Sequence, residues 1–91
     1  MAIIVHFTPA AMSVGAYERV LDLLRDQGLG APSGRLSHAC YGVGDNLRVV
    51  DIYDSQESFE AFGQTLVPLL VQHGIDMGQP VVEEVHNFVS A

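Results

Sequence analysis

The stretch Val49–Phe62, VVDIYDSQESFEAF, joins an apolar strand pattern directly to a helical one. Its first five residues alternate in the way that is typical of a half-buried strand, and Asp54 or Ser55 can cap the helix that follows. Glu57 falls in the first helical turn, where the helix dipole favours an acidic side chain. The apolar face of this helix then recurs at helical spacing, with Phe59, Phe62 and Leu66. The stretch predicts a strand that runs straight into a helix.

The residues before this stretch predict a strand, a helix and one half of a hairpin. A β-branched run at Ile3–Phe7 is typical of a strand. We expect a helix between a cap at Ser13 and a stop at Gly28. A second strand is expected at Leu36–Tyr41, and the turn residues after it indicate a hairpin with a third strand at Leu47–Tyr53.

The residues after the stretch complete the order of elements. The second helix is expected to end at His73-Gly74, with a kink or restart near residues 66–68 because Pro68 removes a backbone donor. A fourth strand is expected at Val81–Val89. The order β-α-β-β-α-β predicts an α+β, ferredoxin-like fold, with a four-stranded antiparallel sheet and two helices on one face. Residues 1–91 form one domain of this kind, since the chain is too short for a second core.

Composition indicates that this domain associates with a second copy. Hydrophobic residues make up 48% of the chain and charged residues only 16%, although a chain this short buries only about 60–65% of its unfolded surface. Two helices cover one face of the sheet, and the strands carry too few charges for the other face to be left to water. We therefore expect a homodimer that forms through the sheets and closes a barrel.

Charge and cysteine usage exclude several classes of function. The net charge is −7, and the only cations are four arginines. Nucleic-acid binding and attraction to an anionic membrane both need a basic surface, so neither is expected. The single cysteine, Cys40, forms no intrachain disulfide and fits a reducing compartment. No apolar run is long enough to span a membrane, and MAIIVHFTP lacks the features of a signal peptide, so we expect a cytoplasmic protein.

The order of elements, the segment RVVDIYDSQESFEAF and the terminal VHNFV resemble the dimeric α+β barrel superfamily. Within it the chain is similar to antibiotic-biosynthesis-monooxygenase-like domains, over essentially its whole length. The resemblance implies a pocket between sheet and helices in each subunit. It also implies a range of activities, including oxygenation without a cofactor, haem degradation and isomerisation. The chain has no tryptophan, on which haem degraders commonly rely, so haem is not expected. Oxygenation of the kind that the resemblance implies needs no bound cofactor, so we expect none.

Strand alternation places Asp51 and Tyr53 on one face of the third strand. A phenol at Tyr53 either donates a hydrogen bond to a ligand oxygen or packs with a backbone partner. A covered carboxylate at Asp51 must find Arg48, a backbone amide or a ligand. Tyr53 is thus a candidate catalytic residue and Asp51 a candidate binding residue.

His38 is the other candidate catalytic residue, because a mid-strand histidine among small neighbours can transfer a proton near neutral pH. The alternative is a histidine satisfied by a backbone carbonyl. His6 and His86 are expected on the neighbouring first and fourth strands, but no pair has the spacing of metal ligands, so no metal site is predicted. His73 at a helix end suits the dipole there.

Two functions remain open at this point. The first is a monooxygenase-like enzyme for a small apolar, aromatic or polyketide-like molecule, with a proton shuttled by His38 and a substrate oxygen held by Tyr53. The second is a non-catalytic, ligand-binding or stress-associated dimer. Four residues are candidates for binding the ligand in either case, although the helical ones are chiefly core by their spacing: Tyr17, Asp51, Phe62 and His86.

Overall fold

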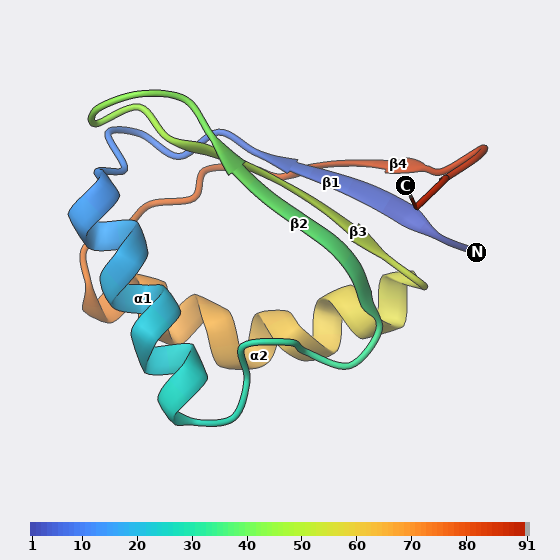
Figure 1. Ribbon diagram of the computed structural model, residues 1–91, viewed down its shortest axis with the longest axis horizontal. Coiled ribbons are helices and arrows are strands. Elements are labelled where there is room, and N and C mark those ends of the chain that lie inside the picture. The colour runs from blue at the N-terminus through green and yellow to red at the C-terminus, as the bar shows by residue number, and fades with distance from the viewer. Residues whose placement is uncertain (91) are drawn as a thin grey trace.

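The structure, a computed structural model, describes residues 1–90 and contains the six elements in the expected order. They are β1 (Ile3–Phe7), α1 (Val14–Asp26), β2 (Arg35–Tyr41), β3 (Arg48–Tyr53), α2 (Gln56–Gln72) and β4 (Val81–Glu84). The four strands pair antiparallel in the order β2-β3-β1-β4. Both helices lie on the same face of this sheet (Figure 1). The ferredoxin-like α+β prediction is confirmed.

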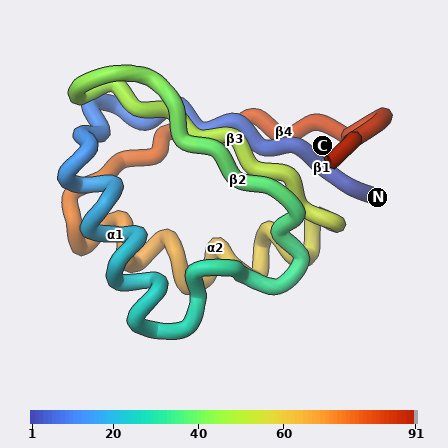
Figure 2. The backbone as a smooth tube through the Cα atoms, in the orientation of Figure 1, coloured from blue at the N-terminus to red at the C-terminus, as the bar shows by residue number. Residues whose placement is uncertain are grey.

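The core fills the space between the sheet and the two helices. The backbone trace shows the sheet and the helices as two separate layers (Figure 2). In β1 every second residue is buried, so Val5 is completely covered while its neighbours in sequence are half-exposed. In β3 the buried set includes Asp51 and Tyr53, and Val50 and Ile52 lie on the opposite, outer face. Asp51 and Tyr53 therefore share one face, as the sequence predicted, and the structure shows that this face is turned towards the helices.

Serine side chains cap both helices. The Oγ atoms of Ser13 and Ser55 each accept a hydrogen bond from the backbone N–H three residues later, at 3.1 Å. The cap of α2 is thus Ser55 and not Asp54. Beyond the helix ends, Gly28 and Gly74 adopt positive φ angles of 75° and 68°, which end a helix without strain in a glycine.

The expected restart near Pro68 does not occur, because α2 runs through this residue as one helix. Proline lacks the N–H that would bond the carbonyl of Gln64, one turn earlier. Both residues are solvent-exposed, so water can satisfy that carbonyl and the helix continues.

The fourth strand is shorter than predicted, since β4 ends at Glu84 and not at Val89. Glu84 pairs with Ile3, the first residue of β1, so no partner strand remains beyond it. A last backbone bond runs from Val85 N–H to the carbonyl of Ala2, at 2.9 Å. His86 therefore lies after the strand, exposed to solvent, and not beside His6 in the sheet.

A β-bulge interrupts the pairing of β2 with β3. Arg35 lies opposite Tyr53 and Ser37 opposite Ile52, so Leu36 is one residue more than β3 can pair. In an uninterrupted strand Arg35 and His38, three positions apart, would lie on opposite faces. The extra residue brings both to the face that carries Tyr53, and Leu36 is left half-exposed.

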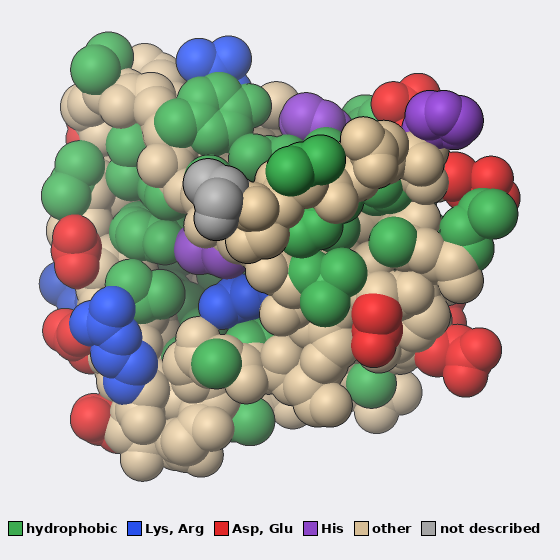
Figure 3. Space-filling view, turned by 45° about the vertical axis from the view of Figure 1, so that its right-hand side comes forward, with side chains coloured by type: hydrophobic (Ala, Val, Ile, Leu, Met, Phe, Trp, Pro, Cys, Tyr) green, Lys and Arg blue, Asp and Glu red, His purple; other side chains and the backbone are tan. Residues whose placement is uncertain are grey.

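The outer face of the sheet is largely apolar, and both helices lie on the opposite face (Figure 1). Ile4, Val50 and Ile52 lie on this face beside His6, and all four are only partly buried. Exposed hydrophobic side chains also lie among acidic ones in the space-filling view (Figure 3). Within the described residues, neither helix has the length and apolar character needed to cross a membrane.

Gly34, immediately before β2, should not tolerate a side chain. Its φ is 86°, and an added Cβ would collide with Oγ of Ser58 and lie 2.8 Å from Oδ1 of Asp54. We expect Gly34→Ala to lower the free energy of unfolding by about 1–3 kcal/mol, as for other strained positions. Gly63→Ala is the matched control, because Gly63 is helical with open space around it. It should raise stability by about 0.5–1 kcal/mol, and urea denaturation would measure both. Equal stabilities for the two variants would contradict the strain assigned to Gly34.

Candidate functional site

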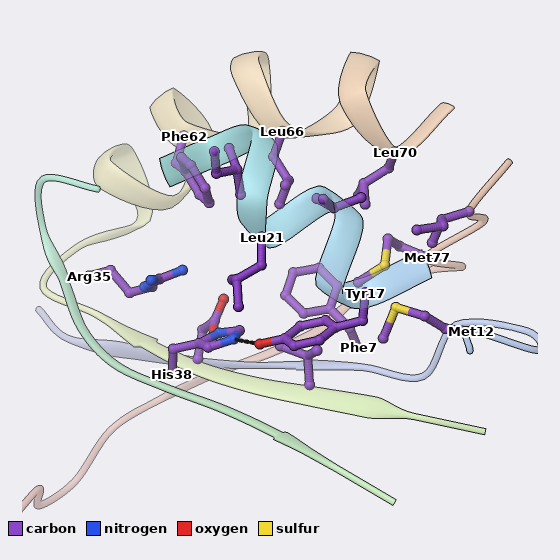
Figure 4. Close-up of a pocket in the computed structure, with 15 residues that line it drawn as sticks. Phe7, Met12, Tyr17, Leu21, Arg35, His38, Phe62, Leu66, Leu70 and Met77 are labelled. Atoms are coloured by element: carbon purple, nitrogen blue, oxygen red, sulfur yellow. Dashed lines mark hydrogen bonds and ion pairs between the residues drawn. The ribbon is translucent and has the colours of Figure 1, made fainter. Parts of the chain in front are cut away.

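A small cavity of about 50 Å³ lies between the inner face of the sheet and the helices (Figure 4). Its walls are mostly aliphatic, aromatic and thioether side chains, and three charged or titratable groups other than tyrosine reach it from the sheet: Arg35, His38 and Asp51. The remaining lining residues are Phe7, Met12, Tyr17, Val20, Leu21, Leu24, Val49, Phe62, Leu66, Leu70, Ile75 and Met77. The polar chemistry is thus concentrated on one wall of an apolar space.

His38 and Asp51 form the centre of this wall. They are directly paired residues of β2 and β3, and Nδ1 of His38 lies 2.5 Å from Oδ1 of Asp51. The side chain of Asp51 is only 4% exposed and that of His38 22%. A carboxylate buried this deeply needs a donor, and the imidazole N–H supplies one. The partner of Asp51 is therefore neither Arg48 nor a backbone amide: Arg48 lies on the outer face, with its guanidinium 4.8 Å from the ring centre of Tyr41.

Tyr17 of α1 extends this pair to the helical layer. Its hydroxyl lies 2.7 Å from Nε2 of His38, as the dashed line in Figure 4 shows. The carboxylate of Asp51 can only accept, so the proton of a neutral imidazole belongs on Nδ1. Nε2 then accepts from the Tyr17 hydroxyl. Burial raises the pKa of Tyr17, with smaller contributions in the same direction from Cys40 and Asp51, so the phenol keeps its proton.

Tyr53 holds the other oxygen of the carboxylate. Its hydroxyl donates to Oδ2 of Asp51 at 3.2 Å, and the residue is 1% exposed. Burial, followed by the charge of Asp51, raises the pKa of Tyr53 far above its ordinary value, while Arg35 opposes this shift. Tyr53 is not among the residues that line the cavity. Its hydroxyl contacts Asp51 and is influenced by Arg35, so Tyr53 can act on the cavity through these two lining residues.

Arg35 is a site residue that the sequence analysis did not single out. Its side chain lines the cavity and points into it in Figure 4, with the guanidinium 5.8 Å from the ring centre of Phe62. One nitrogen donates to the carbonyl of Gly30 at 3.0 Å. Only the bulge at Leu36 brings Arg35 to this face, and no residue pattern in the sequence announces a bulge there.

The other sequence candidates fall in different places. Phe62 lines the cavity from α2, and His86 is remote from it, exposed beyond the end of β4. Burial raises the pKa of the Cys40 thiol, as does Glu18 to a smaller degree, which does not favour a nucleophilic thiolate. In residues 1–90 no three histidine, cysteine or acidic side chains gather in a way that could hold a metal ion.

The alkaline stability of the protein should depend on Tyr53. Because its pKa is raised on folding, the folded state keeps this proton above pH 10, where the unfolded state begins to lose it. Stability from this source is fully present below about pH 10 and falls as the pH rises further. Urea unfolding at a series of pH values should show a shallower alkaline decline for Tyr53→Phe than for the unmodified protein. Tyr41→Phe, on the exposed outer face, is the control. An unchanged decline in Tyr53→Phe would refute the burial effect.

Comparison with known proteins confirms the fold and gives no closer relation. No family model matches the chain, and no curated protein matches it significantly in sequence. Several solved structures are similar. A putative antibiotic biosynthesis monooxygenase from Deinococcus radiodurans is 12% identical, with 98% of this chain and 97% of that chain covered and a TM-score of 0.63. Rv0793 from Mycobacterium tuberculosis is 19% identical, with the same coverage and a TM-score of 0.62.

A third similar structure is SnoaB, a cofactor-independent oxygenase from Streptomyces nogalater. It is 14% identical, with 99% of this chain and 96% of that chain covered and a TM-score of 0.61. The match extends over nearly the full length of both chains in each of the three cases. The resemblance stated from the sequence is thus confirmed for the architecture: the chain has the fold of the antibiotic biosynthesis monooxygenase-like proteins.

Proposed function

We propose that the protein is a small monooxygenase-like enzyme that removes a proton from an apolar, enolisable molecule without a bound cofactor. The observation that carries this proposal is the His38–Asp51 pair, which is set in the wall of an apolar cavity. A histidine oriented by a buried carboxylate is a suitable general base, because the carboxylate stabilises the imidazolium that forms. The shared fold with a cofactor-independent oxygenase supports the same reaction class.

In this reaction Nε2 of His38 is the atom that accepts the proton. Nδ1 is held by Asp51, and the position at Nε2 is filled by the hydroxyl of Tyr17 until a substrate displaces it. The Tyr53 hydroxyl fixes the second oxygen of Asp51, so it acts as a positioning residue. The substrate carbanion then reduces dioxygen. A methylene becomes a carbonyl, one oxygen atom stays in the product, and the other leaves as water with the two hydrogens.

The volume of the cavity favours a second candidate, a non-catalytic binding protein. About 50 Å³ is a third of the ~150 Å³ in an engineered cavity that takes up benzene. An aromatic substrate therefore requires side chains to move. Met12 and Met77 are suited to this, because both line the cavity and methionine side chains are flexible. The experiment on His38 below distinguishes the two candidates.

We further propose that two copies associate through the outer faces of their sheets. Ile4, Val50 and Ile52 form an apolar strip on that face and are only partly buried. Stable interfaces of this type are more hydrophobic than ordinary protein surface. The cavity lies on the opposite side of the sheet, so it stays available in the dimer.

Replacement of His38 by asparagine tests the enzyme. An asparagine amide can still donate to Asp51 but has no group at the position of Nε2. With anthrone and the smaller indanone as probes, we expect the native protein to accelerate hydrogen–deuterium exchange at the acidic C–H. His38→Asn should reduce that acceleration about 10²–10⁴-fold. Exchange is followed by proton NMR without oxygen, and oxygen uptake is then measured separately.

His73→Asn is the matched control, because His73 caps α2 outside the cavity and should leave both rates unchanged. If the native protein binds the probes and exchanges no protons, the binding protein is the correct function and the enzyme is refuted. Equal exchange rates in His38→Asn and the native protein would likewise remove His38 as the base.

The dimer is tested by light scattering, which should report about twice the chain mass of 9.8 kDa. Val50→Glu places a charge in the middle of the outer face and should give a folded monomer. Val67→Glu, at an exposed position of α2, should stay dimeric. A native protein that is monomeric at micromolar concentration would refute this association.

A further inference from the structure

Arg35 gives the cavity a positive charge that the proposed reaction does not use. It is the only cation among the lining residues, and it reaches the cavity from the same wall as His38 and Asp51. We propose that Arg35 binds the carboxylate of the ligand, so that the cavity selects small apolar carboxylic acids in their anionic form. This inference rests on the proposed function in one respect, that the ligand occupies this cavity.

The guanidinium has donors to spare. Of its five N–H groups, one donates to the Gly30 carbonyl at 3.0 Å and one interacts with the Tyr53 hydroxyl, which leaves three. Within residues 1–90 a carboxylate lies within ion-pair distance of Arg25 and of the His38 imidazole, and none lies within that distance of Arg35. No fully buried side-chain nitrogen in this part of the chain lacks a partner. The free N–H groups of Arg35 are therefore accessible, and an entering ligand can reach them.

The surroundings of Arg35 suit a planar anion. Its guanidinium lies over the ring of Phe62, so the N–H groups at the edge of the guanidinium remain free to donate. A guanidinium with two free parallel N–H groups matches the two oxygens of a carboxylate. The remainder of the lining is apolar, which strengthens an ion pair formed there and accommodates a hydrocarbon body.

The local charge limits the ligand to a single negative charge. The Asp51 carboxylate is already compensated by hydrogen bonds from His38 and Tyr53. Arg35 is the one guanidinium in the lining and can pair with one carboxylate, whereas a dianion such as phosphate would leave a second negative charge unpaired beside Asp51. The chain has a net charge of −7, so the positive charge of Arg35 in this cavity is unusual for the protein.

A β-bulge in the backbone positions Arg35. Arg35 faces the cavity only because the bulge at Leu36 shifts the alternation of β2 by one residue. Gly34, with its φ of 86°, packs against Ser58 and Asp54 and fixes the start of the strand. The position of the guanidinium is therefore set by the fold and not by a flexible loop.

Paired probes of equal shape test this inference. Benzoate and isobutyrate carry the charge, and benzamide and isobutyramide are their neutral counterparts. We expect each acid to bind the native protein at least about tenfold more tightly than its amide, as measured by titration of the ¹⁵N-labelled protein in NMR. In Arg35→Gln the acid should lose this advantage and bind about as weakly as the amide. Arg35→Lys, which keeps the charge and loses the fork, should lie between them.

Arg25→Gln is the matched control, because Arg25 is an exposed arginine of α1 that should leave all four affinities unchanged. Thermal unfolding of each variant confirms that it is folded. The inference is refuted if the amides bind as tightly as the acids, if Arg35→Gln keeps the preference, or if no acid binds. Binding is measured without oxygen or turnover, so an absence of proton exchange would refute the enzyme and leave this result standing.

Discussion

A carboxylate buried between a sheet and its helices is the constraint on which this structure depends. Asp51 cannot remain charged in that layer without donors, and it obtains them from His38 on the neighbouring strand and from Tyr53 on its own. Tyr17 then joins α1 to the same network through His38. The network thus fixes the register of β2 against β3 and the position of α1 on the sheet. The groups that satisfy this burial are also the groups that can move a proton, so fold and candidate site share one set of side chains.

The architecture was predictable because it depends on local patterns. Alternation in β3 showed correctly that Asp51 and Tyr53 share a face, and cap residues located both helix starts, at Ser13 and at Asp54 or Ser55. The partner of Asp51 was not predicted, since it depends on which residue of β2 lies opposite. Strand alternation alone would have excluded Arg48 as the partner of Asp51, because Arg48 is three positions from Asp51 and so lies on the other face. The length of β4 was overestimated for a related reason, because an edge strand ends where its neighbour ends.

The two walls of the cavity differ in chemistry. Apart from Tyr17 of α1, the charged and titratable groups come from the sheet, where they are held by strand pairing and by one another. The helices and the loop after α2 supply apolar side chains such as Leu66 and Met77. Changes among these apolar residues can therefore alter the size and shape of the space while the chemistry stays in place. This separation is consistent with a fold shared by proteins that are less than 20% identical to this one.

The bulge at Leu36 makes the polarity of the cavity depend on the pairing register of β2 as well as on residue identity. If β2 paired with β3 without the bulge, Leu36 would lie opposite Tyr53 and the arginine would turn to the outer face. The inner wall would lose its guanidinium, and a cation would enter the apolar strip through which two copies are proposed to meet. A shift of one residue in register would thus change two surfaces at once, in opposite directions. Sequence alignments that ignore the bulge would match an inward-facing residue of one protein of this fold with an outward-facing residue of another.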